Sequence, residues 1–283
     1  PPFCWIKDDK VVEVPDIISD TKLFKPIKEG GWGFRPGPMI SGWDPYTNIP
    51  VTTERGVKYI HDQAKTDDPF FLYFAYPSPH VPIIPNDEFD GKSQAGPYGD
   101  FVVETDDSCG KLLQALKNSG QDKNTIVIFS ADNGPAHYAY DRDEKFDHWS
   151  SQPFRGVKRD VYEGGHRVPF IVKWPGVTKA GTVSDALVSQ IDIMATIADF
   201  VGYKLPDDQA EDSHNLAPLL RGDVDAVRTT HIHNTTNTQY AIRHGDWVLI
   251  DAKEGYSKAH DEAEAWEEKH GYPDDDDQPA ELF

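Results

Sequence analysis

Several side chains of this sequence have types and positions that suit chemistry on an anionic group. Asp132 and Asn133 stand on a turn closed by Gly134, directly after an apolar run, and they offer a carboxylate and an amide oxygen. Hard oxygen donors of this kind suit Ca²⁺ or Mg²⁺. Asp-Asn-Gly is also an ordinary turn sequence. Two donors fall short of the about six oxygens that such an ion takes, so further ligands must come from elsewhere.

Two basic side chains could bind the anion itself. Lys158 stands in a glycine-flanked loop, where a compact ammonium group can neutralise charge on an oxygen. The ordinary alternative is a solvated surface lysine. His80 follows Pro79, and its imidazole can donate a hydrogen bond or a proton. An isolated histidine is more often structural, so both assignments depend on the surrounding sequence.

The elements around these residues predict a βαβ unit. Residues 70–76 are a continuous apolar run and residues 124–130 contain a second one at 126–129, both typical of strands buried on both faces, and residues 100–119 have helical spacing between them. Such a crossover makes the two strands parallel. Ligands bind beyond the carboxyl ends of parallel strands. His80 and the turn at 132–133 should therefore meet at one edge of the sheet.

The rest of the chain predicts an α/β fold, with a largely parallel central sheet flanked by helices and a small antiparallel C-terminal subdomain. Residues 1–222 are assigned to the α/β domain and residues 223–283 to the subdomain. The supporting segments are a strand at 168–174, a helix at 191–201, and short strands at 229–233, 240–243 and 247–250.

The composition excludes several classes of protein. Among 283 residues, Asp and Glu exceed Lys and Arg by 48 to 28, and the net charge of -20 disfavours nucleic-acid binding. No apolar run approaches the roughly 20 residues that a membrane-spanning helix needs. Cys4 and Cys109 are the two cysteines, which excludes a disulfide-rich scaffold. Because the net charge is strongly negative, an anionic substrate requires a local cationic pocket.

Five segments in order resemble the sulfatases, of the arylsulfatase type in the alkaline-phosphatase-like superfamily. The most specific are Asp-Asn-Gly after a strand and the pattern R-G-x-K-x-x-x-Y-E-G-G-x-R-x-P, which occupies residues 155–169. The flanking segments are residues 79–82, 174–176 and 190–196. The resemblance covers about residues 68–283.

The resemblance implies hydrolysis of a sulfate monoester, either an aryl or a carbohydrate sulfate. It implies Asp132 and Asn133 as ligands of Ca²⁺, with Mg²⁺ possible, and His80 and Lys158 as catalytic residues that contact the sulfate. His148 is the best candidate for a further substrate contact. The expected partner is a sulfated small molecule or glycan, and the expected location is the periplasm or outside the cell.

One feature of the sulfatases is absent from this sequence. Their nucleophile is a formylglycine made from a C/S-x-P/A-x-R motif, which the surroundings of Cys4, Cys109 and Ser78 do not match. Our hypothesis is that an N-terminal portion carrying this motif was cut away, was lost, or lies in another chain. Two alternatives stay open: hydrolysis of phosphodiesters or phosphonates in the same superfamily, and a non-catalytic remnant that binds sulfated glycans.

Two further expectations concern supporting residues. Arg155, Glu163 and Arg167 should hold the lysine-bearing loop through ion pairs and hydrogen bonds. The acidic run at residues 274–277 should be a solvated turn, with Ca²⁺ binding as the alternative.

Overall fold

The computed structural model describes residues 2–20, 27–29, 34–235, 239–252, 255–256, 261–272 and 281–282. The chain forms two compact units. The first unit comprises Pro1–Asn124 and Glu144–His148, and the second comprises Thr125–Asp143 and Trp149–Phe283. The acidic run at 274–277 lies outside the described residues. Among the described residues, no helix combines the length and the apolar character that crossing a bilayer requires.

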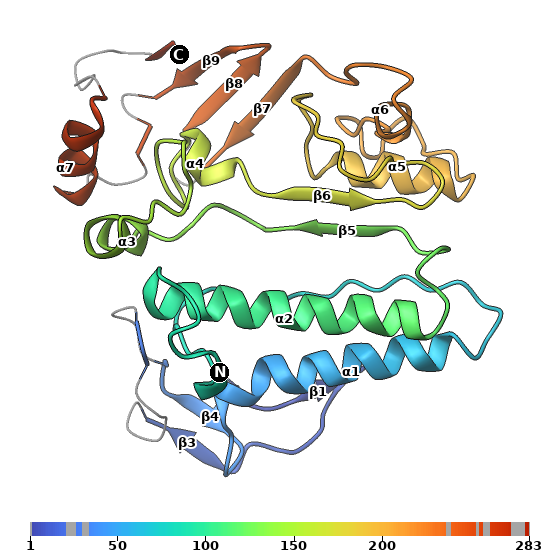
Figure 1. Ribbon diagram of the computed structural model, residues 1–283, viewed down its shortest axis with the longest axis vertical. Coiled ribbons are helices and arrows are strands. Elements are labelled where there is room, and N and C mark those ends of the chain that lie inside the picture. The colour runs from blue at the N-terminus through green and yellow to red at the C-terminus, as the bar shows by residue number, and fades with distance from the viewer. Residues whose placement is uncertain are drawn as a thin grey trace. The chain divides into compact units, whose positions relative to one another are not determined.

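The first unit is built on two long helices that run side by side (Figure 1). They are α1 (Asn48–Gln63) and α2 (Gly96–Asn118). The smaller elements are two antiparallel strand pairs, β1 (Ile6–Lys7) with β2 (Lys10–Val11) and β3 (Ile17–Ser19) with β4 (Gly37–Met39), and the short helices η1 (Pro45–Thr47) and η2 (Asp87–Phe89). Helix α2 overlaps the helix predicted at residues 100–119.

Close packing explains the residues at the interface of α1 and α2. A Cβ added at Gly56 would lie 2.7 Å from the Phe74 ring and 2.8 Å from Leu112, so a larger residue there would force these side chains to shift. The hydroxyl groups of Thr53 and Ser108 share a hydrogen bond inside the same interface. Both are buried, so each hydroxyl needs such a partner.

The second unit is built on small antiparallel sheets. β5 (Val127–Ser130) pairs with β6 (Phe170–Lys173), and a separate sheet has the strand order β10-β9-β8-β7. Those strands are β7 (Thr230–Asn234), β8 (Tyr240–His244), β9 (Trp247–Asp251) and β10 (Glu281–Leu282). The helices are α4 (Glu163–His166), α5 (Asp192–Phe200), α6 (Ala217–Arg221), α7 (Asp261–His270), and α3 (Tyr138–Phe146), whose last residues belong to the first unit.

The α/β class and the antiparallel C-terminal strands are confirmed, whereas the parallel central sheet is not found in the described residues. Residues 70–76 belong to no strand, and β5 pairs antiparallel with β6. Phe71 and Tyr73 are 74% and 81% exposed, so this run packs on one face only. Apolar content predicted burial but does not encode which segment pairs with which. The division expected between residues 222 and 223 stays a prediction.

A buried ion pair joins α5 of the second unit to the segment before β7. Arg228 donates from Nε to the Asp192 carboxylate at 3.1 Å, and the side chains are 5% and 0% exposed. Asp192 also accepts from the backbone N–H groups of Ser189 and His214. A buried charge is tolerated only when it is paired in this way.

Arg228→Met should therefore destabilise the second unit strongly, because Asp192 would keep a buried charge without its partner. We expect the free energy of unfolding to fall by about 3–5 kcal/mol in urea denaturation at pH 7. Arg221→Met is the matched control, since Arg221 pairs with Asp223 on the surface at 45% and 54% exposure. That exposed pair should contribute no more than about 1 kcal/mol. Equal losses in the two variants would contradict the assignment.

Candidate functional site

The backbone joins the Asp132–Asn133 turn to the loop that carries Lys158. Gly134 donates its N–H to the carbonyl of Gly165 at 2.9 Å, and Lys158 donates its N–H to the carbonyl of Pro135 at 2.7 Å. Both partners belong to the second unit. The two segments predicted to carry the metal ligands and the cation are thus brought together, although the sequence separates them by more than twenty positions.

Glycines make this approach possible. A Cβ added at Gly134 would lie 1.8 Å from the Gly164 carbonyl oxygen, and one at Gly164 would lie 2.0 Å from the Gly156 oxygen. One at Gly165 would lie 2.4 Å from the Asp160 oxygen. Real Cβ atoms do not come so close to a backbone oxygen. The glycines of the two motifs are therefore required by contact between main chains.

The turn presents oxygen donors without strong competitors. Asp132 is exposed, and no hydrogen bond or ion pair of its carboxylate is found among the described residues. Asn133 donates from Nδ2 to the carbonyl of Gly134 at 2.9 Å, which leaves its Oδ1 as an acceptor. These hard donors fit Ca²⁺ or Mg²⁺. In the described part of the chain, no group of three His, Cys, Asp or Glu residues could hold a metal alone, so the donor set is incomplete.

Lys158 is partly exposed, and its ammonium group has no carboxylate within ion-pair distance in the described residues. Lys28, by contrast, pairs with Asp87 at 3.3 Å. In a protein with a net charge of -20, a lysine held on an ordered loop without an acidic partner is well suited to bind an anion.

The expected supporting role of three charged residues is confirmed. Arg155 pairs with Glu267, lies 9% exposed, and places its guanidinium 4.0 Å from the centre of the Tyr162 ring. Glu163 accepts from Arg167 at 2.8 Å and also pairs with Arg243 of β8. These contacts fix both sides of the Lys158 loop to the C-terminal part of the second unit.

Two further residues hold this loop and were not predicted from the sequence. Asp160 is fully buried, and its Oδ2 accepts the N–H of Val157 at 2.8 Å. His233 donates from Nε2 to the carbonyl of Val161 at 3.1 Å, since a carbonyl can only accept. Asp160 stands inside the recognised motif, which was a usable signal. For His233, on β7, the sequence carries no such signal because the contact joins distant positions.

His80 belongs to the first unit, and its ring is exposed. Its Nδ1 lies 2.6 Å from the carbonyl of Val81, so Nδ1 carries the proton and Nε2 is left for a ligand. His80 lines a cavity of about 210 Å³ together with Tyr46, Phe101, Glu104 and other residues of the unit. Because residues 70–76 form no ladder with β5, the sheet-edge argument no longer places His80 beside Asp132. A shared site stays a prediction.

His148 also belongs to the first unit. Its ring lies 6.4 Å from that of Tyr98, centre to centre, and among the described residues it does not line the cavity that contains His80. A role in substrate contact stays a prediction.

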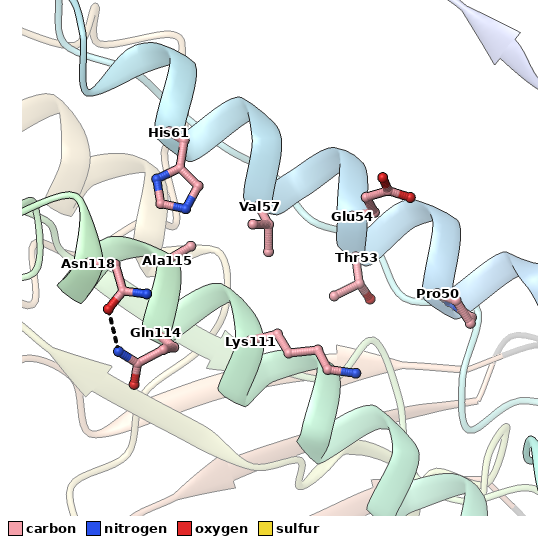
Figure 2. Close-up of a pocket in the computed structure, with 9 residues that line it drawn as sticks. All are labelled: Pro50, Thr53, Glu54, Val57, His61, Lys111, Gln114, Ala115 and Asn118. Atoms are coloured by element: carbon pink, nitrogen blue, oxygen red, sulfur yellow. Dashed lines mark hydrogen bonds between the residues drawn. The ribbon is translucent and has the colours of Figure 1, made fainter. Parts of the chain in front are cut away.

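A second hollow of the first unit lies along α1 and α2, as Figure 2 shows. It has a volume of about 400 Å³ and includes Glu54, His61 and Lys111 in its lining. The Lys111 ammonium pairs with Asp107 at 2.6 Å, so it is not free to bind an anion. None of the predicted site residues lines this groove in the described part of the chain.

Solved structures define the fold class. A structure described in connection with the metabolism of multiple glycosaminoglycans by Bacteroides thetaiotaomicron has a TM-score of 0.73 and 30% identity, over 89% of this chain and 51% of that chain. A sulfatase from Pseudoalteromonas sp. has a TM-score of 0.67 and 28% identity, over 77% and 42%. The fold is therefore the mixed α/β fold of the alkaline-phosphatase-like superfamily.

The family follows from the sequence match. The family model described as Sulfatase matches residues 15–203, and the model for the C-terminal part of N-sulphoglucosamine sulphohydrolase matches residues 156–268. The first match covers more than half of the chain. The chain belongs to the sulfatase family, which confirms the resemblance seen in its motifs.

Curated relatives agree with this family. The N-acetylgalactosamine-6-O-sulfatase of Bacteroides thetaiotaomicron is 33% identical over 223 residues, which is 77% of this chain and 43% of the relative. The N-acetylgalactosamine-6-sulfatase of Mus musculus is 40% identical over 171 residues, which is 60% and 32%. The arylsulfatase of Hemicentrotus pulcherrimus is 32% identical over 206 residues, which is 72% and 36%. The chain thus spans less than half the length of these relatives.

Gly164→Ala should disturb the Lys158 loop, because the new methyl group would meet the backbone oxygens of Gly156 and Arg155. We expect the free energy of unfolding to fall by about 1–3 kcal/mol, as for other overpacked sites. The Lys158 amide, bonded to Pro135, should exchange its hydrogen faster. In Gly110→Ala of α2, where an added Cβ meets no atom within 4 Å, the Lys158 amide should exchange as in the parent chain. Equal exchange in all three proteins would refute the packing argument.

His166, at the end of α4, should make the second unit sensitive to acid. Burial, assisted by His233 at a ring distance of 4.4 Å, lowers the pKa of His166 from its ordinary 6.5 to about 4. The unfolded chain therefore takes up a proton as the pH falls below 6.5, before the folded chain does, so folding stability decreases between pH 6.5 and 4. We expect a loss of about 1–2 kcal/mol, discounted for partial exposure.

The measurement is urea unfolding of the parent chain and of His166→Met at several pH values across this window. The variant should lose less stability on acidification than the parent, because it has no buried imidazole to protonate. Parallel pH dependence of the two proteins would show that His166 does not contribute.

Proposed function

We propose that this chain supplies sulfate- and metal-binding residues of a sulfuric ester hydrolase that cleaves an aryl or carbohydrate sulfate. The proposal rests on the backbone hydrogen bonds that hold the Lys158 loop against the Asp132–Asn133 turn. The ammonium group of Lys158 has no acidic partner among the described residues. A cation and hard oxygen donors on adjacent backbone suit an anion that is bound together with a divalent ion. Membership of the sulfatase family supports sulfate as that anion.

Each residue has a stated part in this proposal. The Lys158 ammonium neutralises charge on the sulfate oxygens or on the leaving oxygen. Asp132 and Asn133 would hold Ca²⁺ or Mg²⁺, which supplies positive charge to the same group when bound. His80 donates through Nε2 when it is an imidazolium, because its Nδ1–H is already directed to Val81. His148 is proposed as a substrate contact.

The formylglycine nucleophile of the family does not fit either cysteine. Cys109 lies within α2 and donates to the hydroxyl of Tyr76 at 3.4 Å, and Cys4 stands between Phe3 and Trp5. We propose that an N-terminal segment outside these residues provides this group. A chain that binds sulfated glycans without turnover is the second candidate, favoured by the same absence in the sequence.

The names of the relatives support a proposal about the substrate class. Several are named N-acetylgalactosamine-6-sulfatases, so a sulfated amino sugar is the first substrate to test. We propose an exported protein, periplasmic or secreted, as for the family in general. Hydrolysis of phosphodiesters or phosphonates is not favoured, because the family model and the curated relatives are sulfatases.

The proposal predicts metal-dependent binding of sulfate. Calorimetry with inorganic sulfate and with N-acetylgalactosamine 6-sulfate should show binding that strengthens when Ca²⁺ is added. Lys158→Ala should weaken it by about tenfold or more, since a charge-assisted hydrogen bond is lost. Asp132→Asn should weaken the Ca²⁺ effect. The exposed residues Lys179 and Asp185 provide matched controls, Lys179→Ala and Asp185→Asn, which should behave as the parent.

Sulfate release separates the two candidates. Release measured by ion chromatography from the chain supplied with a formylglycine-bearing segment would support the hydrolase, whereas metal-dependent binding without release would support the glycan-binding remnant. Binding that is unaffected by Lys158→Ala would overturn both.

A further inference from the structure

The His80 loop, which we define as residues 78–86, is fastened at both ends to α2 of the first unit. At its start, the hydroxyl groups of Ser78 and Thr105 are 2.6 Å apart, and both residues are 9% exposed. Thr105 also donates to the carbonyl of Phe101, one turn earlier, at 2.8 Å. Since a hydroxyl has one proton, Ser78 donates to Thr105 when Thr105 donates to Phe101.

The end of the loop is fastened by the neighbouring residue of the same helix. Asn86 donates its backbone N–H to Oε2 of Glu104 at 2.9 Å, and its side-chain Nδ2 lies 2.5 Å from Oε1. The same Nδ2 donates to the carbonyl of Tyr46 at 3.1 Å. Glu104 is 3% exposed, so its carboxylate is shielded from water and depends on these donors for its hydrogen bonds. Loss of either donor would leave a buried acceptor unsatisfied.

Between these two ends, the buried Ile83 makes two backbone hydrogen bonds, accepting from Lys28 at 3.0 Å and donating to Glu29 at 3.3 Å, whereas the His80 side chain has few contacts. His80 is exposed, and its ring nitrogen Nδ1 contacts only the carbonyl of the adjacent Val81 among the described residues. The contacts of the loop with α2 at its two ends, together with those of Ile83, therefore determine where the imidazole can lie. Asn86, Glu104 and His80 also line the same cavity of about 210 Å³.

We propose that Glu104 and Thr105 are positioning residues that hold His80 ready to bind the sulfate group of the ligand. This rests on the proposed function, in which His80 contacts that group. A loop already ordered before binding does not lose further conformational freedom on binding, so the affinity is higher. Neither residue touches the ligand in this proposal; both act through the backbone of residues 78–86.

The test compares two threonines of the same unit. Thr105→Val removes the hydroxyl that holds the loop, and Thr53→Val removes a similarly buried hydroxyl that bonds to Ser108 and to the carbonyl of Ile49, with no hydrogen bond to the loop in the described residues. Both variants should lose similar folding stability. Thr105→Val should weaken the affinity for inorganic sulfate by about threefold to tenfold, and Thr53→Val should not.

Rescue and spectroscopy distinguish positioning from general damage. Thr105→Ser keeps the hydroxyl and should restore the affinity of the parent. In the NMR spectrum without sulfate, the imidazole signals of His80 should shift or broaden in Thr105→Val and in Glu104→Gln, and should be unchanged in Thr53→Val. Equal affinities and equal His80 signals in Thr105→Val and Thr53→Val would overturn the proposal.

A further variant separates this proposal from the proposed function. His80→Ala should weaken sulfate binding at least as much as Thr105→Val does. If His80→Ala leaves the affinity unchanged, the role of His80 in the proposed function fails, and the positioning role fails with it. If His80→Ala weakens binding but Thr105→Val behaves as Thr53→Val, only the positioning role fails.

Discussion

Contact between main chains is the constraint on which the candidate site depends. Gly134 and Lys158 donate their backbone N–H groups to Gly165 and Pro135, and no side chain takes part in either bond. Such bonds require glycine where a Cβ would collide with a carbonyl oxygen. The charged side chains are then free of structural duties, which explains why Asp132 and Lys158 can both remain unpaired toward protein groups in the described part of the chain.

Local features of the fold were predictable from the sequence, whereas the pairing of strands was not. Helical spacing over residues 100–119 located α2, and the structure places Gly120, with a positive φ of 75°, just after its end, because helix signals act over a few residues. The apolar run at 70–76 suggested a buried strand, yet Phe71 and Tyr73 are exposed. A run of aromatic residues reports the hydrophobicity of a segment, but strand direction depends on partners that are distant in the sequence.

The same distinction applies to the candidate site. Lys158, Asp132 and Asn133 were found because they lie in short motifs whose order is informative. Glu267 and His233 were not, since their contacts with Arg155 and Val161 span 112 and 72 positions and involve ordinary residue types. His80 was identified from its neighbours Pro79 and Pro82. The hydrogen bond by which Thr105 of α2 holds the His80 loop has no sequence signature.

The long reach of the Arg155 contacts has a consequence during synthesis. Tyr256 and Glu267, which hold this buried guanidinium, follow it by 101 and 112 residues. A ribosome adds about 5–20 residues per second, so the segment around Arg155 lacks these two partners for on the order of ten seconds of synthesis. Throughout that interval an arginine destined for the interior remains hydrated, and the local structure around it matures only after its C-terminal counterparts emerge.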